Sequence, residues 1–162
     1  MNRFFKVSLL LMALIFAAST RSSAQTTKYK CMIQMTNYMG DGAYIVISLV
    51  DPKGEYEKTL YVLGDDKKWY KSMKEWYKFH TKKPSNLSAI TGASVTGGDR
   101  SVNTIEIETA KLNAGYTLRF ESAVEDKPYH IKDVEIPLTT EALGAKTDGD
   151  KGYIRYVRFS AN

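Results

Sequence analysis

The sequence predicts a mainly β fold, an immunoglobulin-like antiparallel β-sandwich with one inserted amphipathic helix. Seven short β-prone runs are separated by turn signals rich in Gly, Pro, Asn and Asp. Several of these runs alternate apolar and polar residues, which is typical of half-buried antiparallel strands. After the third run the period changes to that of a helix packed along one face.

The first residues have the pattern of a secretory signal peptide. Arg3 and Lys6 form a positively charged start, residues 7–18 form an apolar run, and residues 22–24 (Ser-Ser-Ala) offer a cleavage site. The apolar run is short for a membrane span, and small polar residues follow it, which disfavours an uncleaved anchor. We therefore expect residues 1–24 to be removed and the protein to be periplasmic or secreted.

The expected mature chain, residues 25–162, is a single β-sandwich domain. Removing 24 of 162 residues leaves 138, which suits one domain with a substantial core. Because Arg3, Lys6 and Arg21 leave with the signal peptide and no acid does, the net charge falls from +5 to +2. So small a charge gives little support for nucleic-acid binding. We expect no nucleic-acid partner and no direct membrane contact after signal removal.

Seven segments are expected to be strands. They are residues 29–38, 43–50, 57–63, 102–109, 115–124, 129–137 and 152–160. In the fifth of them, Tyr116, Leu118 and Phe120 should share the inward face and Arg119 the outer one. Residues 138–150 have weak patterning and two glycines, which predicts a long loop.

The segment from Asp66 to Lys82 has the spacing of an amphipathic helix. Its stripe residues are Trp69, Tyr70, Met73, Trp76, Tyr77 and His80, and lysines cover the other face. Asp65 or Asp66 can cap the start, and Pro84 ends the helix. A basic amphipathic helix can lie on an anionic membrane, but such a stripe more often packs on a sheet, and we expect packing.

Conventional catalytic and metal sites find little support in the sequence. Cys31 is the one cysteine, so no intrachain disulfide can form, and its strand-like context predicts a small buried apolar residue. No nucleophile motif accompanies His80 or His130 in the sequence. The sequence also has no Cys pair and no His-x-x-x-His spacing, so it does not predict a zinc site. The turn 148–150 (Asp-Gly-Asp) lacks the further acids of a calcium loop. We expect no catalytic residue, no metal and no independent enzyme.

Residues 88–96 (Ser-Ala-Ile-Thr-Gly-Ala-Ser-Val-Thr) are the segment that points to chemistry. A phosphoryl-linked cofactor needs an exposed hydroxyl on a flexible turn without large neighbours. Gly92 and Ala93 supply reach and clearance, and Ser94 supplies the oxygen. A hydroxyl is a poor nucleophile, so a separate enzyme with bound metal must make the transfer. The alternative is a plain turn between strands.

This core resembles the acceptor site onto which bacterial flavin transferases attach FMN through a phosphoester bond. That motif ends in Ser/Thr-Gly-Ala-Thr and has an Asp three residues before its first hydroxyl. The resemblance makes Thr91 the first hydroxyl and Ser94 the acceptor, with Gly92 and Ala93 between them. Ser88 stands at the Asp position, and Thr96 is a second candidate acceptor.

The wider chain resembles a periplasmic family, number 2271 among the domains of unknown function. The resemblance is carried by residues 58–63, 69–70, 76–77, 88–94 and 114–119. The family's Pro-Gly and Trp-Asp-Gly stretch after the motif is replaced here by Thr96 to Asn103.

The resemblance implies an exported accessory protein of flavin-based redox that carries FMN covalently. Its implied partners are a periplasmic flavin transferase and a membrane redox protein. Trp69, Tyr70, Trp76 or Tyr77 could shield the flavin ring by stacking. The alternative is a non-catalytic immunoglobulin-like binding module of the periplasm or cell surface, in which residues 91–94 merely link two strands.

Overall fold

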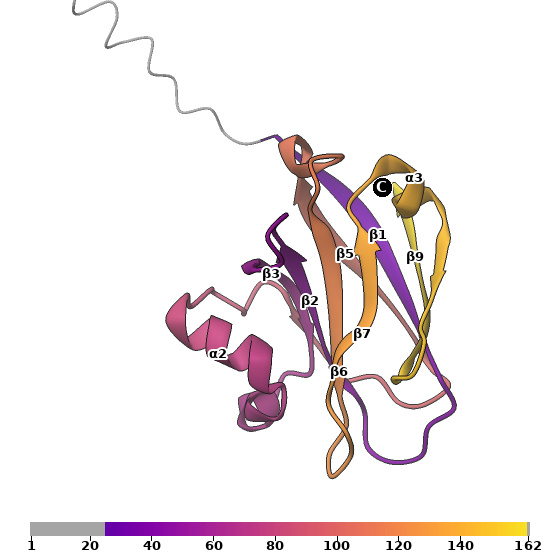
Figure 1. Cartoon of the computed structure of the whole chain (residues 1–162). Coiled ribbons are helices and arrows are strands. Elements are labelled where there is room, and N and C mark those ends of the chain that lie inside the picture. Colours follow the sequence, from indigo (N-terminus) through magenta and orange to yellow (C-terminus); the bar gives the residue numbers. More distant parts are fainter. Residues whose placement is uncertain (1–24, 162) are drawn as a thin grey trace, which may run out of the picture.

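The protein is a β-sandwich of two facing sheets, described by a computed structural model over residues 25–161 (Figure 1). The mainly β sandwich with a helical segment inserted after the third strand is therefore confirmed. The expected signal peptide and its cleavage site lie outside the described residues. No helix in the described part of the chain is long and apolar enough to cross a membrane.

Four antiparallel strands form one sheet in the order β5-β1-β9-β8. They are β5 (Arg100–Glu108), β1 (Thr26–Met35), β9 (Ile154–Ala161) and β8 (Lys146–Asp148). Five strands form the other sheet in the order β4-β3-β2-β6-β7. They are β4 (Thr91–Gly92), β3 (Tyr56–Leu63), β2 (Tyr44–Val50), β6 (Thr117–Ala123) and β7 (His130–Pro137). This second sheet is mixed, because β4 runs parallel to β3.

The main core fills the space between the sheets. Ile33 of β1 and Ile105 of β5 meet Ile45 of β2 and Phe120 of β6 there, all buried. Cys31 belongs to the same cluster, and burial raises the pKa of its thiol, so its predicted role as a small buried residue is confirmed. Alternation along the strands brings these side chains inward and supplies the main hydrophobic stabilisation.

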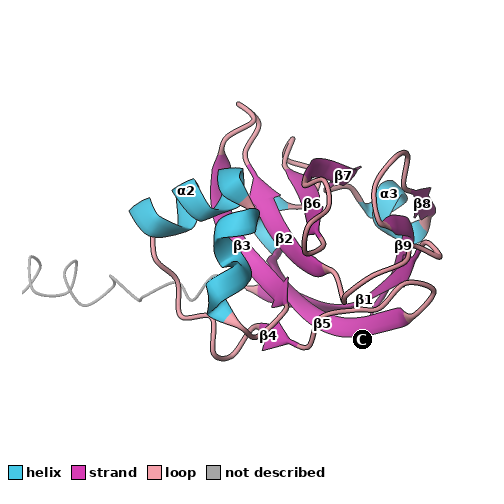
Figure 2. Cartoon of the chain, turned by 90° about the horizontal axis from the view of Figure 1, so that it is seen from below, coloured by secondary structure: helices cyan, strands magenta, loops and turns pink. Residues whose placement is uncertain are grey.

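A second apolar cluster lies on the outer face of the five-stranded sheet, under the helical segment. That segment is a 3₁₀ helix η1 (Lys67–Ser72) followed by α2 (Lys74–Lys82), which lies outside β2 and β3 (Figures 1 and 2). Met73 and Trp76 are fully buried in this cluster. The expected single helix is thus divided at Met73, but the prediction that its stripe packs on the sheet is confirmed.

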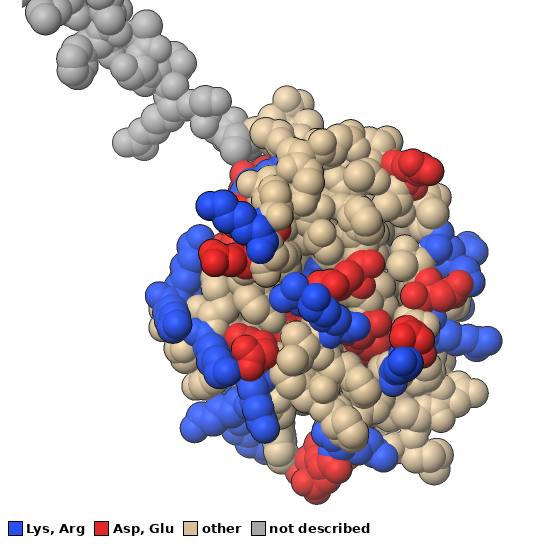
Figure 3. All heavy atoms as spheres, viewed as in Figure 1, with Lys and Arg blue, Asp and Glu red and all other residues tan. Residues whose placement is uncertain are grey.

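Lysines gather on the solvent side of this segment, at the left of Figure 3. Asp66 caps η1, since its carboxylate accepts a hydrogen bond from the Lys68 N–H at 3.1 Å, as predicted. The helix ends at Lys82, two residues before Pro84. The basic face is therefore the exposed side of a helix whose apolar side is occupied.

One further sequence expectation was wrong. Residues 138–150 are not a long loop: they contain α3 (Thr140–Gly144) and β8. The short helix is capped by the Thr139 hydroxyl, which accepts from the Ala142 N–H at 3.1 Å. Arg119 lies on the outer face of β6, as expected, but this face is covered, and Arg119 and Glu121 are both buried. The helical segment forms a third layer on this sheet, so residues on both faces of β6 are buried. The usual difference in exposure between the two faces of a strand is therefore absent here.

Candidate functional site

Thr91 and Gly92 are held at the edge of the five-stranded sheet as β4. They pair in parallel with Val62 and Leu63 of β3. The Val62 N–H donates to the Ile90 carbonyl at 2.8 Å, and the Gly64 N–H donates to the Gly92 carbonyl at 2.7 Å. The first half of the Thr-Gly-Ala-Ser core is therefore fixed by backbone pairing. A strand of two residues is too short for its composition to indicate this pairing in the sequence.

The other end of the core is anchored at Val95, whose side chain enters the main core. Ala43 and Val95 exchange two backbone hydrogen bonds of 2.7 and 3.1 Å. The Tyr38 hydroxyl also donates to the Val95 carbonyl at 2.5 Å. Ala93 and Ser94 span the interval between these anchors, and both are exposed.

The Ser94 side chain lies beside the backbone of Gly42, in the turn that precedes β2. A Cβ atom on Gly42 would lie 2.5 Å from the Ser94 Oγ, closer than real contacts allow. Gly42 thus provides room for the Ser94 hydroxyl in its present position. Ser94 borders two hollows on the surface.

The first of these, the Trp69 hollow, has a volume of about 230 Å³. Besides Ser94 its lining includes Tyr44 and Trp69, with the carboxylates of Asp41 and Glu125. Trp69 is partly exposed, so its indole can offer a flat surface to a ligand.

The other three aromatic residues proposed for stacking lie elsewhere. Tyr70 and Trp76 are buried against the sheet. Tyr77 lines a separate hollow, and Ser94 is not among the residues that line it. Trp69 is therefore the one of the four that shares a hollow with the candidate acceptor.

The second, the Arg100 hollow, has a volume of about 310 Å³ and is lined by Ser94, Thr96, Asp99 and Arg100, among others. The Arg100 Nε donates to the Gln34 Oε1 at 3.2 Å, which orients the guanidinium. Thr96 is exposed and reaches this hollow but does not line the Trp69 hollow. Ser94 thus has access to an aromatic surface and to a cation, whereas Thr96 has access to the cation alone.

Thr91 and Ser88 have other roles. The Thr91 hydroxyl donates to the Leu87 carbonyl at 2.6 Å, so it braces the segment. Ser88 is exposed, and its N–H donates to the Asn86 Oδ1 at 3.1 Å. Ser88 lines neither hollow beside Ser94; the carboxylates that share a hollow with Ser94 are Asp41 and Glu125 on the Trp69 hollow and Asp99 on the Arg100 hollow.

Comparison with protein families matched residues 26–156 to the family described as predicted periplasmic protein (DUF2271). The chain belongs to the DUF2271 family. The match covers nearly all of the sandwich, including both hollows beside Ser94, and the family description agrees with the predicted periplasmic location. Searches of curated proteins and of solved structures gave no match.

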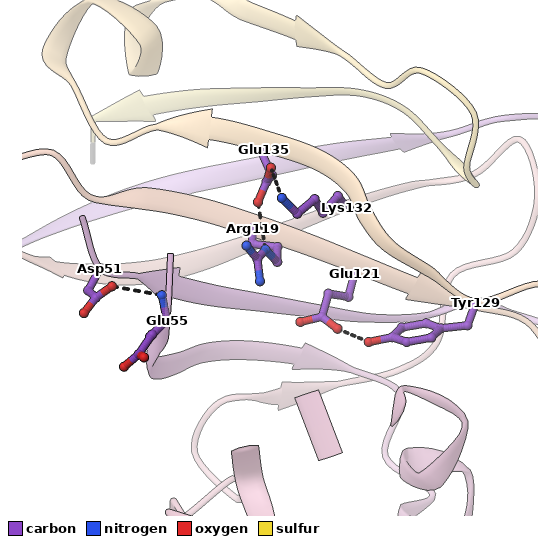
Figure 4. A network of polar contacts seen from close by, with 7 residues as sticks. All are labelled: Asp51, Glu55, Arg119, Glu121, Tyr129, Lys132 and Glu135. Carbon is purple, nitrogen blue, oxygen red and sulfur yellow. Dashed lines mark hydrogen bonds and ion pairs between the residues drawn. The ribbon is translucent and has the colours of Figure 1, made fainter. Parts of the chain in front are cut away.

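The DUF2271 sandwich also holds a buried polar cluster that the sequence did not indicate (Figure 4). Glu121 is 0% exposed, and its carboxylate accepts a hydrogen bond from the Tyr129 hydroxyl. Burial raises the pKa of Glu121 to about 7. Arg119 points another way, donating from Nε to Glu135 at 2.8 Å. In the sequence, Glu121 alternates with the inward-facing residues of β6, a pattern that predicts a side chain facing solvent. The sequence therefore did not indicate that this carboxylate is buried.

The remaining candidate residues of this DUF2271 protein serve structural contacts. The His130 ring packs edge-on against Tyr153 at 5.0 Å. Asp148 pairs with Lys146 at 2.6 Å, in β8. Within the described residues no group of three or more His, Cys, Asp or Glu side chains is placed to hold a metal ion.

Proposed function

We propose that the protein is an exported accessory of flavin-based redox that carries FMN in phosphoester linkage on Ser94. The observation that supports this most directly is the position of the Ser94 hydroxyl: exposed, between two anchored ends, and bordering both hollows. A buried hydroxyl within a strand ladder would have argued for a plain turn instead.

The residues around Ser94 fit the chemistry of FMN. The flavin ring system is flat and aromatic, and Trp69 and Tyr44 line the Trp69 hollow. A phosphodiester is anionic, and the Arg100 guanidinium lines the Arg100 hollow. Asp41 and Glu125 would repel phosphate from the Trp69 hollow. The lining of the Arg100 hollow also contains Asp99, so it carries one cation and one carboxylate, whereas the lining of the Trp69 hollow carries two carboxylates and no cation. This difference in charge favours the ring in the Trp69 hollow and the phosphate in the Arg100 hollow.

Bound FMN would supply one- or two-electron chemistry, while the protein positions it. The chain's own contribution is to present Ser94 on a short anchored span, to offer the Trp69 indole as a surface, and to offset phosphate charge with Arg100. A periplasmic flavin transferase with bound metal would form the ester, because a serine hydroxyl is a poor nucleophile. With a flavin adenine dinucleotide as the donor, the bond from the Ser94 Oγ to phosphorus would form as the pyrophosphate P–O bond breaks, AMP would leave, and the hydroxyl proton would pass to a base of the transferase. A membrane redox protein would then exchange electrons with the carrier.

Intact-mass measurement after coexpression with a periplasmic flavin transferase tests this proposal. We expect the protein to gain the mass of one FMN phosphoester and Ser94→Ala to lose the adduct completely. Thr96→Ala is the matched control, since Thr96 lies on the same segment and lines the Arg100 hollow alone, and it should keep the adduct. An unmodified native protein, beside a known acceptor that the same transferase modifies, would exclude the carrier function.

A non-catalytic binding module is the second candidate. A hollow of about 440 Å³ is lined by residues of β3 and β5, among them Lys58, Leu60, Thr104 and Glu106, and by residues of the 85–90 segment. Exposed strand edges can accept an extended partner segment. This alternative gains weight if the mass measurement gives no adduct, because residues 91–94 would then serve as a strand link alone.

A further inference from the structure

A third hollow, with a volume of about 380 Å³, lies between the helical segment and residues 84–88. We call it the Lys67 hollow; its lining includes Lys67, Tyr77, His80, Ser85, Asn86 and Leu87. Its volume lies at the lower end of the range for small-molecule sites. It shares no lining residue with the two hollows beside Ser94, so it is independent of any flavin.

The charges of this lining have one sign. Lys67 is its cation, and none of the described residues that line it is Asp or Glu. Asn86 and Ser88 add neutral hydrogen-bonding groups, and both are exposed. A hollow with a cation, polar donors and no carboxylate is complementary to an anion.

The other walls are apolar or aromatic. Tyr77 is partly exposed, and Leu87 is buried. The His80 ring is stacked on the fully buried Trp76, with ring centres 5.0 Å apart, so its orientation is fixed by the core. Flat surfaces beside one cation fit a ligand with a planar body and one negative charge.

We infer that the Lys67 hollow is a binding site for a small organic acid, a single carboxylate joined to a flat ring. Lys67 would offset the carboxylate charge, the 84–88 segment would supply hydrogen bonds, and Tyr77 would contact the ring. One cation matches one carboxylate, and a cavity of this size holds a single-ring compound rather than a polymer.

His80 makes this binding measurable. Burial, followed by the nearby Lys67 ammonium, lowers the pKa of His80. The other titratable groups in the lining are the phenols of Tyr70 and Tyr77, and residues 84–88 contribute neutral side chains. A bound carboxylate would oppose the effect of Lys67 and favour the imidazolium. Acid binding should therefore raise the pKa of His80 and be stronger at lower pH.

The test is an NMR pH titration of the two histidines of the exported protein, with benzoate as the probe and benzamide as its neutral counterpart. At about 10 mM benzoate, ten times a millimolar Kd, we expect the pKa of His80 to rise by about 1. His130 lies in β7, outside the hollow, and should not respond. Benzamide should leave both histidines unchanged.

Lys67→Gln should abolish the response of His80 to benzoate. Lys74→Gln is the matched control: Lys74 is an exposed lysine of the same segment that does not line the hollow, and the variant should respond as the native protein does. Both substitutions are at exposed positions, so both variants should fold. An unchanged His80 in the native protein, equal responses of the two histidines, or an intact response in Lys67→Gln would each overturn the inference.

Discussion

The carboxylate of Glu121 shows how a single residue can set the pH dependence of this fold. One of its oxygens accepts the Tyr129 hydrogen bond, and the other is buried without a hydrogen-bond partner among the residues that the structure describes. An ionised carboxylate so placed loses hydration that the site does not replace. Its pKa is raised from the ordinary 4.5 to about 7, so the folded protein holds the proton more tightly than the unfolded chain does.

We predict that Glu121→Gln stabilises the protein at pH 8 and not at pH 4. The stabilisation from a raised carboxylate pKa is fully present below pH 4.5 and is lost as the pH rises through about 7. A shift of this size corresponds to roughly 3 kcal/mol at most. Glutamine stays neutral and can still accept from Tyr129. Free energies of unfolding from urea titrations at the two pH values would measure the gain.

Glu106→Gln is the control for this prediction, because Glu106 is an exposed carboxylate on β5. It should give the same small change at both pH values. If Glu121→Gln has no larger benefit at pH 8 than at pH 4, the buried charge is compensated in some other way and the assignment is wrong.

The helical segment is the element whose position depends most on a few buried side chains. Trp76 is fully buried against the sheet, and its indole N–H donates to the Thr59 hydroxyl at 2.9 Å. Trp69, one short element earlier, is partly exposed at the Trp69 hollow. The two tryptophans of the stripe thus divide into one that holds the segment to the sheet and one that faces a candidate ligand.

We predict that Trp76→Ala destabilises the protein by about 3–5 kcal/mol, because it removes a large buried ring and leaves the Thr59 hydroxyl unpaired. Trp69→Ala, the matched control, should cost less than about 1 kcal/mol. Urea unfolding followed by far-ultraviolet circular dichroism would compare the two. Equal losses would contradict the division of roles.

At the scale of the whole molecule, Asp133 ties the two sheets together. It lies in β7 of the five-stranded sheet, and its Oδ2 accepts from the backbone N–H groups of Tyr153 and Ile154, at the start of β9, at 2.9 and 3.1 Å. The Ser122 hydroxyl donates to the same carboxylate. Gly152 packs so closely that a Cβ there would meet the carboxylate. One side chain of β7 therefore serves groups from two other segments, β6 and the start of β9.

We predict that Asp133→Ala costs about 2–4 kcal/mol of unfolding free energy, since two buried backbone N–H groups lose their acceptor. Asp133→Asn keeps an acceptor oxygen and should cost distinctly less. Asp148→Ala, at an exposed position of β8, is the control and should be nearly neutral. A loss for Asp133→Ala no larger than for Asp148→Ala would show that the sheets do not depend on this contact.

Seven of the nine strands and the packing of the helical stripe could be predicted from the sequence, because alternation and helical periodicity record which side of each element meets the core. The two missed strands, β4 and β8, have two and three residues, too few to show a period. The Thr-Gly-Ala-Ser core is visible as letters, and its hydroxyl and glycine chemistry follows from residue type.

What only the tertiary structure decided is which residues surround Ser94 and which charges are buried. Gly42, Trp69 and Arg100 lie far apart along the chain and meet at Ser94 through strand pairing and the docking of η1. Glu121 became a buried acid because a helical segment covers the outer face of the sheet. Local patterns record whether a residue faces one sheet's core, but long-range packing determines its neighbours, and pKa values and ligand fit depend on those neighbours.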